Sequence, residues 1–254
     1  MDAVLPLSDD LIIEIGPGTG ALTELLAKRC SRVIAVEIDP QLVAYLASLQ
    51  LPPNTAVVQA DALKLDWDDL IAAAIGSDSQ SYKNGKKRVR IVANLPYYIS
   101  TPIIERLIKF TGRIHDMTLM LQNEVVDRVV APPGSKTYGY LSILVQYYCV
   151  TAKLFEVPPL AFQPAPKVWS AVVKLTVRQR PSIDVDDEKR FFELVRAAFA
   201  QRRKTIANNL KAWSGSRRPV EHVLAEAGLD PRRRAETISM DEFAALYRSL
   251  HTAR

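Results

Sequence analysis

Short apolar, β-favouring runs alternate with helix-like stretches through the first half of this chain, and this alternation is the feature that most restricts its fold. The residues of these runs are apolar almost throughout, instead of at every second position. Such strands are buried on both faces, which is typical of parallel strands covered by helices. The sequence therefore predicts an α/β fold with a doubly wound, Rossmann-like sheet. The first four strand-like runs are LIIEIG, RVIAVEID, TAVVQAD and VRIVANL.

The segment after these runs continues the alternation and then changes. We expect a helix near 101–111, a strand at HDMTLMLQ, and helices that begin at Glu124 and Tyr140. Two further strand candidates, AKLFEV and SAVVKLTV, are separated by a proline-rich loop, as in a hairpin at the end of a sheet. The first domain is therefore predicted to span residues 1–180.

The remaining residues, 181–254, predict a small all-helical domain. Its first part reads as a long amphipathic helix broken near Thr205, and further helices are expected at 220–227 and 240–250, the latter with Ser239 as its N-cap. The apolar face of the first helix is predicted to carry Phe191, Leu194, Val195 and Ala198.

Composition restricts the class of protein. With 48% hydrophobic and 24% charged residues in 254, the chain is globular, and no apolar run reaches the roughly 20 residues that cross a bilayer. The first residues, MDAVLPLSDD, do not resemble a signal peptide, so we expect a cytoplasmic protein without a membrane partner. Cys30 and Cys149 lie within apolar helical patterns without a neighbouring His or Cys, which favours buried thiols over a metal site or disulfide.

The net charge of +5 fits an acidic partner, and its distribution is more informative than its size. Each basic cluster alone is more often a solvated face, but four clusters beside a nucleobase site favour phosphate binding. The clusters are KNGKKRVR (83–90), QRRK (201–204), Arg217 with Arg218, and Arg232 to Arg234.

A glycine-rich turn, EIGPGTGAL, joins the first strand to the first helix, where such a sheet approaches its ligand most closely. Gly16, Gly18 and Ala21 meet the GxGxxG/A pattern, and Gly20 lies in the same turn. Glu37 follows at the end of the second strand, about 20 residues on, where an acidic residue accepts from both ribose hydroxyls. Asp61, the last residue of the third strand TAVVQAD, could accept from an adenine amine. These residues predict an adenosine-containing cofactor without separating NAD from S-adenosylmethionine.

The fourth strand ends in NLPYY, an abrupt change from apolar to polar and aromatic residues. The Asn94 side-chain oxygen and the Pro96 carbonyl could each accept an N–H from an exocyclic aromatic amine and aim its lone pair at a methyl donor. Proline lacks an N–H and so offers a carbonyl without a competing donor. Tyr97 offers a flat face for a flipped-out base. This pattern favours methyl transfer to a nucleobase, whereas the alternative is a turn with tyrosines packed as core.

Taken in order, these segments resemble the ribosomal RNA small-subunit adenine N6,N6-dimethyltransferase family of the KsgA type. The resemblance runs from about Leu11 to the C-terminus, and it implies a class I methyltransferase sheet followed by a helical rRNA-binding domain. Its segments are EIGPGTGALT, VEID, QADAL, NLPYYISTPII, MLQNEVVDRVVA, YGYLSILVQYY, FEVPPLAFQPAPKVWSAVV, QRRKTIANNL and RAETIS.

The resemblance implies that S-adenosylmethionine donates methyl groups to two adjacent adenosines near the 3′ end of 16S rRNA, in a monomeric enzyme without a metal. Target handling is implied for Asn94, Leu95, Pro96 and Tyr97, with Phe162 on the other face of the base. Cofactor contacts are expected at Gly16, Gly18, Glu37, Ile38, Asp61, Ala62 and Asn94. Phosphate contacts are expected at Arg202, Arg203, Lys204, Arg232, Arg233 and Arg234.

One departure from the family and three alternatives accompany this hypothesis. Family members usually carry a Gly-Gln-Asn-Phe-Leu segment well before the first strand. In this sequence only about ten residues precede LIIEIG, and they do not contain that segment. We therefore expect weaker cofactor binding by the sequence as given. The alternatives are the antibiotic-resistance type that methylates large-subunit rRNA, a non-catalytic RNA-binding factor on the same fold, and an NAD-dependent dehydrogenase. The segments QRRKTIANNL and RAETIS favour the small-subunit enzyme over the first.

Overall fold

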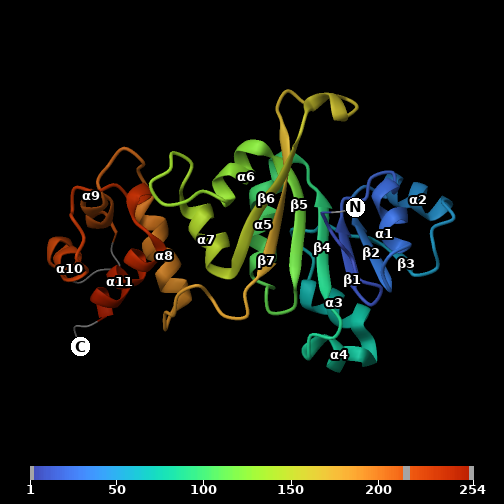
Figure 1. Ribbon diagram of the computed structural model, residues 1–254, viewed down its shortest axis with the longest axis horizontal. Helices are drawn as coiled ribbons and strands as arrows, with labels where there is room; N and C mark the ends of the chain where they lie inside the picture. Colours follow the sequence, from blue (N-terminus) through green and yellow to red (C-terminus); the bar gives the residue numbers. More distant parts are fainter. Residues whose placement is uncertain (1–2, 214–217, 252–254) are drawn as a thin grey trace. The chain divides into compact units, whose positions relative to one another are not determined.

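A seven-stranded sheet organises the first part of the chain (Figure 1). The computed structural model describes residues 3–213 and 218–251. The sheet has the order β3-β2-β1-β4-β5-β7-β6, in which β1 to β5 are parallel and β7 runs antiparallel to β5. The predicted α/β fold is confirmed. The strands are β1 (Leu11–Ile15), β2 (Arg32–Glu37), β3 (Thr55–Gln59), β4 (Val89–Asn94), β5 (Asp116–Gln122), β6 (Cys149–Val157) and β7 (Ser170–Val177).

The helices that connect these strands include two that the sequence reasoning missed, α3 and α4. The sequence does contain a start signal for α3, because Asp66 is a residue type that favours the N-cap position. In the structure its side chain accepts from Asp69 N, and Trp67 and Ile71 on the inner face of the helix are fully buried. The first helices are α1 (Ala21–Ala27), α2 (Pro40–Ser48), α3 (Trp67–Ile75), α4 (Ser79–Lys83), α5 (Ser100–Ile108), α6 (Asn123–Val129) and α7 (Tyr140–Tyr148).

The chain forms two compact units, whose limits differ from a single cut at residue 180. One unit contains residues 1–126 and 150–177, and the other contains 127–149 and 178–254. Segment 127–149 belongs with the later helices because Tyr147 of α7 packs on Phe191 and Phe192, at ring-centroid distances of 5.8 and 5.1 Å. The assignment of a cofactor role to one domain and an rRNA role to the other stays a prediction.

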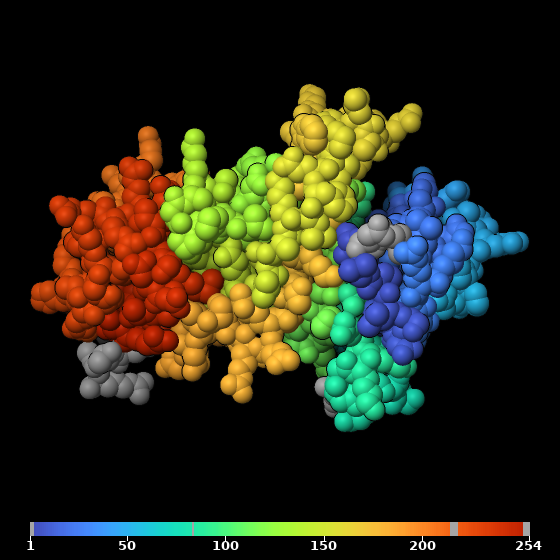
Figure 2. Space-filling view, viewed as in Figure 1, coloured from blue at the N-terminus to red at the C-terminus, as the bar shows by residue number. Residues whose placement is uncertain are grey.

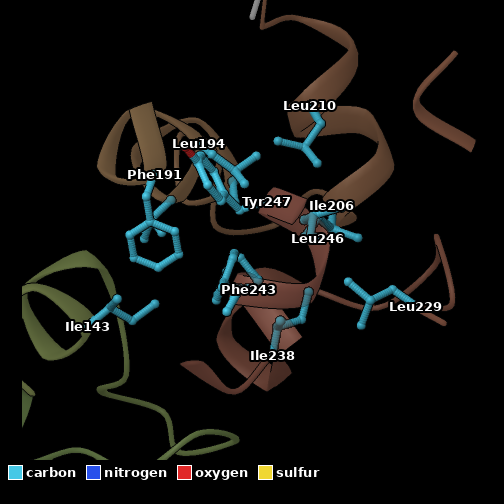
Figure 3. Close-up of a cluster of buried hydrophobic side chains, with 14 of the residues drawn as sticks. Ile143, Phe191, Leu194, Ile206, Leu210, Leu229, Ile238, Phe243, Leu246 and Tyr247 are labelled. Carbon is cyan, nitrogen blue, oxygen red and sulfur yellow. The ribbon is translucent and has the colours of Figure 1, made fainter. Parts of the chain in front are cut away.

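The second unit has its own hydrophobic core (Figure 3). Phe191, Leu194, Val195 and Ala198 are all fully buried, as predicted for the inner face of the first helix. The break that the sequence placed near Thr205 spans several residues, and Thr205 caps the helix that follows by accepting from Asn208 N. The helices of this part are α8 (Glu188–Ala198), α9 (Ile206–Lys211), α10 (Val220–Glu226) and α11 (Met240–His251).

Ser239 is the N-cap of α11, as the sequence predicted. Its Oγ accepts from Glu242 N at 3.2 Å, and Glu242 Oε2 accepts from Ser239 N at 2.8 Å. This reciprocal pair satisfies two backbone N–H groups that the first turn of a helix leaves without a partner.

The two cysteines are buried, although neither lies within a helix as expected. Cys30 follows α1 and Cys149 begins β6. Burial raises the pKa of the Cys30 thiol to about 11 and that of Cys149 to about 12, so both stay protonated at neutral pH. The interpretation as buried thiols is confirmed.

Arg90, which the sequence placed in a basic surface cluster, lies in the interior instead. Its side chain is 4% exposed, with Nε 2.6 Å from Asp10 Oδ2 and Nη1 2.7 Å from Asp116 Oδ2. Both carboxylates are also buried, so Arg90 bridges two anions at the end of the sheet where β4 and β5 begin, and Lys174 Nζ lies 3.8 Å from the same Asp116 oxygen. Of the same cluster, Lys87 pairs with Asp78, and the side chain of Lys83 lies outside what the structure describes.

We expect Arg90→Met to lower the free energy of unfolding by about 3 to 5 kcal/mol, because it leaves the buried Asp10 without an ion pair among the described residues and leaves Asp116 with Lys174 alone, at 3.8 Å. Arg113→Met is the matched control: its pair with Asp68 is about half exposed, and its loss should cost less than about 1 kcal/mol. Urea unfolding of both variants measures the difference. Equal effects would show that the Arg90 cluster does not stabilise the sheet.

Candidate active site

The glycine turn and the end of β4 lie side by side, because β1 and β4 pair in parallel with Ile15 opposite Ala93. The next residues along the two strands are Gly16 and Asn94. Gly16 has a φ of +68°, and a Cβ there would lie 3.8 Å from the Asn94 carbonyl oxygen. A side chain at Gly20, with φ of +82°, would meet Leu46 at 2.8 Å. Glycine is therefore required at these positions by backbone conformation, and at Gly20 also by space.

Glu37 is held in place by its own backbone at the end of β2. It is 6% exposed, and its Oε1 accepts from Ile38 N at 2.9 Å and Asp39 N at 3.0 Å. No described residue donates a hydrogen bond to Oε2. The Ile38 side chain beside it is 61% exposed. The strand end thus offers a fixed carboxylate oxygen next to an apolar surface.

Asp61 lies two residues beyond the end of β3, slightly later than the sequence placed it. The two strand ends are joined because Ala60 N donates to Glu37 O at 2.9 Å. Asp61 Oδ1 accepts from Leu63 N at 2.9 Å, and Oδ2 lies 3.7 Å from Lys64 Nζ. Ala62 is buried, and its carbonyl accepts from Trp67 Nε1.

A pocket of about 300 Å³ opens at the tip of β4. All five residues for which the sequence predicted target handling line it, although Phe162 is far from the others in sequence. The lining consists of Asn94, Leu95, Pro96, Tyr97, Phe162, Pro164 and Pro166. The pocket lies within one unit of the chain, and its volume suits a planar ligand of moderate size.

Two residues that sequence reasoning missed orient the pocket wall. The Tyr97 hydroxyl lies 2.8 Å from Ser170 Oγ, and Ser170 is 1% exposed at the start of β7. Leu95 N donates to Met120 O of β5 at 3.2 Å. The exposed Asn94 side chain makes no hydrogen bond with a described residue, so its amide is available to a ligand. Only the pairing of distant strands could have identified Ser170.

The Pro96 carbonyl has competing donors, contrary to the reasoning from sequence. Ile99 N donates to it at 3.2 Å and Ser100 Oγ at 3.3 Å. Both donors belong to the turn and helix that follow, η2 (Tyr97–Ile99) and α5. No described residue donates to the carbonyl of Leu95, the neighbouring pocket residue. The Leu95 carbonyl oxygen can therefore accept a hydrogen bond from a ligand, whereas the Pro96 carbonyl oxygen already accepts two.

Glu14, in β1, was not singled out from sequence. It is 2% exposed, and its Oε2 accepts from Thr23 Oγ1 of α1 at 2.6 Å. Burial raises the pKa of its carboxyl to about 7, and the bond from Thr23 opposes this rise. This bond ties the strand before the glycine turn to the helix after it.

The predicted phosphate ligands lie in the second unit. Some of them are held by other residues of the chain, and the others are exposed without an ion pair to a described residue. Arg233 is held by Glu242 and Thr237, Arg232 by Asp230, and Arg202 by the Lys136 carbonyl and, at 3.7 Å, Glu236. Arg218 pairs with Glu226, and Arg217 lies outside the described residues. Three residues are exposed and make no ion pair with a described residue, namely Arg203, Lys204 and Arg234.

Within residues 3–213 and 218–251, no group of three or more His, Cys, Asp or Glu side chains is arranged to hold a metal ion. The helices of the same residues include none with the length and apolar character that a membrane span requires.

A sheet with antiparallel β7 beside β5, a glycine turn after β1 and a pocket at the tip of β4 defines a class I methyltransferase fold. The family model described as "Ribosomal RNA adenine dimethylase" matches residues 1–252, and the chain belongs to this family.

Relatives of known name cover most of the chain. The ribosomal RNA small subunit methyltransferase A of Moorella thermoacetica is 48% identical, over 95% of this chain and 83% of that protein. The protein of the same name from Shouchella clausii is 44% identical, over 96% and 81%.

Two solved structures are similar over nearly the whole chain. A dimethyladenosine transferase from Plasmodium falciparum matches with a TM-score of 0.80 and 25% identity, over 98% of this chain and 93% of that one. The 23S rRNA methyltransferase ErmE matches with a TM-score of 0.71 and 24% identity, over 99% of this chain and 95% of that one. At this identity the match supports the fold alone.

Glu14→Gln tests whether the buried carboxyl makes stability depend on pH. Folding raises its pKa from 4.5 to about 7, so its favourable contribution is fully present below pH 4.5 and is lost as the pH rises through 7. Relative to the variant, the wild-type free energy of unfolding should fall by about 2 to 3 kcal/mol between pH 5 and pH 8. Urea unfolding at both pH values measures this. Glu24→Gln, at an exposed site, should track the wild type, and a Glu14→Gln profile parallel to the wild type would contradict the shift.

Proposed function

We propose that this chain uses S-adenosylmethionine to dimethylate the N6 amines of two adjacent adenosines near the 3′ end of 16S rRNA in the small ribosomal subunit. The observation that carries the proposal is the pocket at the tip of β4, where Asn94, Tyr97 and Phe162 meet beside the glycine turn. Membership of the ribosomal RNA adenine dimethylase family supports the same reaction.

The residues around the glycine turn fit an adenosine cofactor. No described residue lies within 4 Å of where a Gly18 Cβ would stand, so a ligand can approach the backbone there. Glu37 Oε2 would accept from the ribose hydroxyls, and the exposed Ile38 side chain would pack on the base. Asp61 and Ala62 would contact the adenine edge, and Gly16 and Asn94 the part nearest the pocket. When bound, S-adenosylmethionine supplies an electrophilic methyl group on a sulfonium.

The tip of β4 can orient the target amine. An adenine N6 lone pair is delocalised into the ring, and acceptors for both N–H groups would favour a geometry in which that lone pair is localised. Asn94 Oδ1 supplies one acceptor. The second is the Leu95 carbonyl in preference to that of Pro96, because Ile99 N and Ser100 Oγ already donate to Pro96.

The aromatic walls of the pocket would hold the extruded base. Tyr97 and Phe162 are both half-buried, and the bond to Ser170 restrains the Tyr97 ring. A base stacked on an aromatic side chain gains roughly 1 to 3 kcal/mol, which offsets part of the cost of unstacking it from RNA. Catalysis is then mainly orientation, because the methylated amine becomes acidic and needs no strong general base.

The small-subunit substrate is favoured over the large-subunit one by the relatives of 44 to 48% identity, all named for the small subunit. A non-catalytic RNA-binding factor would not need an Asn94 amide left open at a pocket. A dehydrogenase is disfavoured by family membership. The monomeric state and cytoplasmic location belong to the same proposal.

Asn94→Ala should lower methyl transfer by on the order of 100-fold, by analogy with loss of one oriented hydrogen-bonding group, while affecting cofactor affinity less. Glu37→Ala should do the reverse and weaken cofactor binding by about 1.5 to 3 kcal/mol. Tritiated-methyl transfer to unmethylated 30S subunits and calorimetry with S-adenosylmethionine measure the two effects. Asn208→Ala, at an exposed amide of the second unit, is the control. Undiminished turnover by Asn94→Ala would remove Asn94 from the reaction.

The exposed cations of the second unit should account for part of the salt dependence of rRNA binding. Replacing Arg203, Lys204 and Arg234 together by alanine should flatten the plot of log affinity against log salt by about 0.7 to 0.9 per lost phosphate contact. Filter binding of small subunits over a salt series measures the slope. Lys28→Ala and Arg113→Ala, which remove exposed cations already paired with carboxylates, should leave it unchanged. An unchanged slope in the triple variant would exclude this surface.

A further inference from the structure

Among the large hydrophobic side chains that the structure describes, the two most exposed both adjoin the β4-tip pocket. Leu160 is 91% exposed and Tyr98 is 84% exposed. Tyr98 follows Tyr97, and Leu160 precedes Phe162 by two residues, so each lies close in the chain to an aromatic residue that lines the pocket. Neither side chain packs in the hydrophobic core, so packing in the core does not account for either residue.

Tyr98 points away from the pocket wall for a geometric reason. Tyr97 and Tyr98 are consecutive in the 3₁₀ turn η2, where neighbouring side chains project about 120° apart. Tyr97 reaches Ser170, which leaves Tyr98 directed to solvent at the edge of the same pocket. Its ring is therefore a flat surface without a protein neighbour to stack on it among the described residues.

Leu160 is presented by an ordered loop. It lies in the 3₁₀ turn η3 (Pro159–Ala161) at the tip of the hairpin formed by β6 and β7, which projects beyond the sheet (Figures 1 and 2). Ala161 N donates to Pro158 O at 3.0 Å, and Phe162 N to Pro159 O at 3.1 Å. The prolines of this loop limit its freedom further, so the leucine is held outward in the folded state.

The surroundings of these two side chains favour a nucleic-acid strand as their occupant. A strand that places one base in the pocket must leave the next nucleotide at the rim. Every base has a flat face that stacks on an aromatic ring, and apolar side chains act as wedges between bases. The exposed Lys167, directly after the pocket residue Pro166, adds a cation for the backbone phosphate.

We propose that Tyr98 and Leu160 form a rim that holds the nucleobase adjacent to the target adenosine. Tyr98 is the stacking platform, and Leu160 is the wedge that prevents this base from restacking on the target. This inference rests on the proposed function and deepens it: one adenosine occupies the pocket while its neighbour waits on the rim, so a pocket for one base serves two adjacent substrates.

The test uses a short single-stranded RNA with 2-aminopurine next to the target adenosine, and the same RNA with an abasic residue there. Wild-type protein should quench the 2-aminopurine, and Tyr98→Ala and Leu160→Ser should bind this RNA about tenfold more weakly. All three proteins should bind the abasic RNA equally, because this RNA lacks the base that the Tyr98 and Leu160 side chains would contact. Tyr98→Trp should restore quenching. Tyr45→Ala and Leu25→Ser, at exposed sites on α2 and α1, are matched controls and should behave as wild type.

A second readout, methyl transfer to unmethylated 30S subunits, separates this inference from the proposed function. Tyr98→Ala should lower kcat/KM by about tenfold mainly through KM, with S-adenosylmethionine affinity unchanged. Tyr98-dependent quenching without methyl transfer by the wild type would support the rim and refute the proposed reaction. Normal transfer with equal quenching in all variants, or no quenching by the wild type, would overturn the rim. Weaker binding of whole subunits with unchanged RNA quenching would overturn it too, because it would indicate a protein partner.

Discussion

The parallel pairing of β1 with β4 is the constraint on which the candidate site depends. Its register puts Gly16 beside Asn94, where the left-handed backbone of the turn, with φ of +68° at Gly16, favours glycine. A shift of one residue would turn every side chain of β4 to the other face of the sheet. Hence the turn for a cofactor and the pocket for a base are positioned by backbone hydrogen bonds in the centre of the sheet, which are the least free to move.

The antiparallel strand β7 completes this site from the far end of the sequence. Its first residue, Ser170, anchors the Tyr97 ring, and the loop that precedes it supplies Phe162 to the opposite wall. An aromatic cage for a base thus needs a hairpin that returns beside β5, where a further parallel crossover would bring a helix instead. The same hairpin loop exposes Leu160, so the fold that builds the pocket also determines its rim.

Two predictions from the sequence were wrong: the surface position of Arg90 and the absence of competing donors to the Pro96 carbonyl. Arg90 looked like a member of a surface cluster, yet its register in β4 places it between Asp10 and Asp116. Pro96 looked like a carbonyl without competing donors, yet the turn after it supplies two. Both errors concern groups whose partners lie in other segments or depend on the exact path of a turn, which local pattern does not specify.

The sequence by itself determined the order of the strands, the glycine turn, Glu37 and the NLPY segment, because periodicity and residue chemistry are local properties. It also assigned Phe162 to the target site, but only through resemblance to a family. Tertiary structure alone decided that 127–149 packs with the later helices, that Ser170 fixes Tyr97, and that Tyr98 and Leu160 stand exposed beside one pocket. These depend on contacts between distant segments, and such contacts exist only once the sheet has formed.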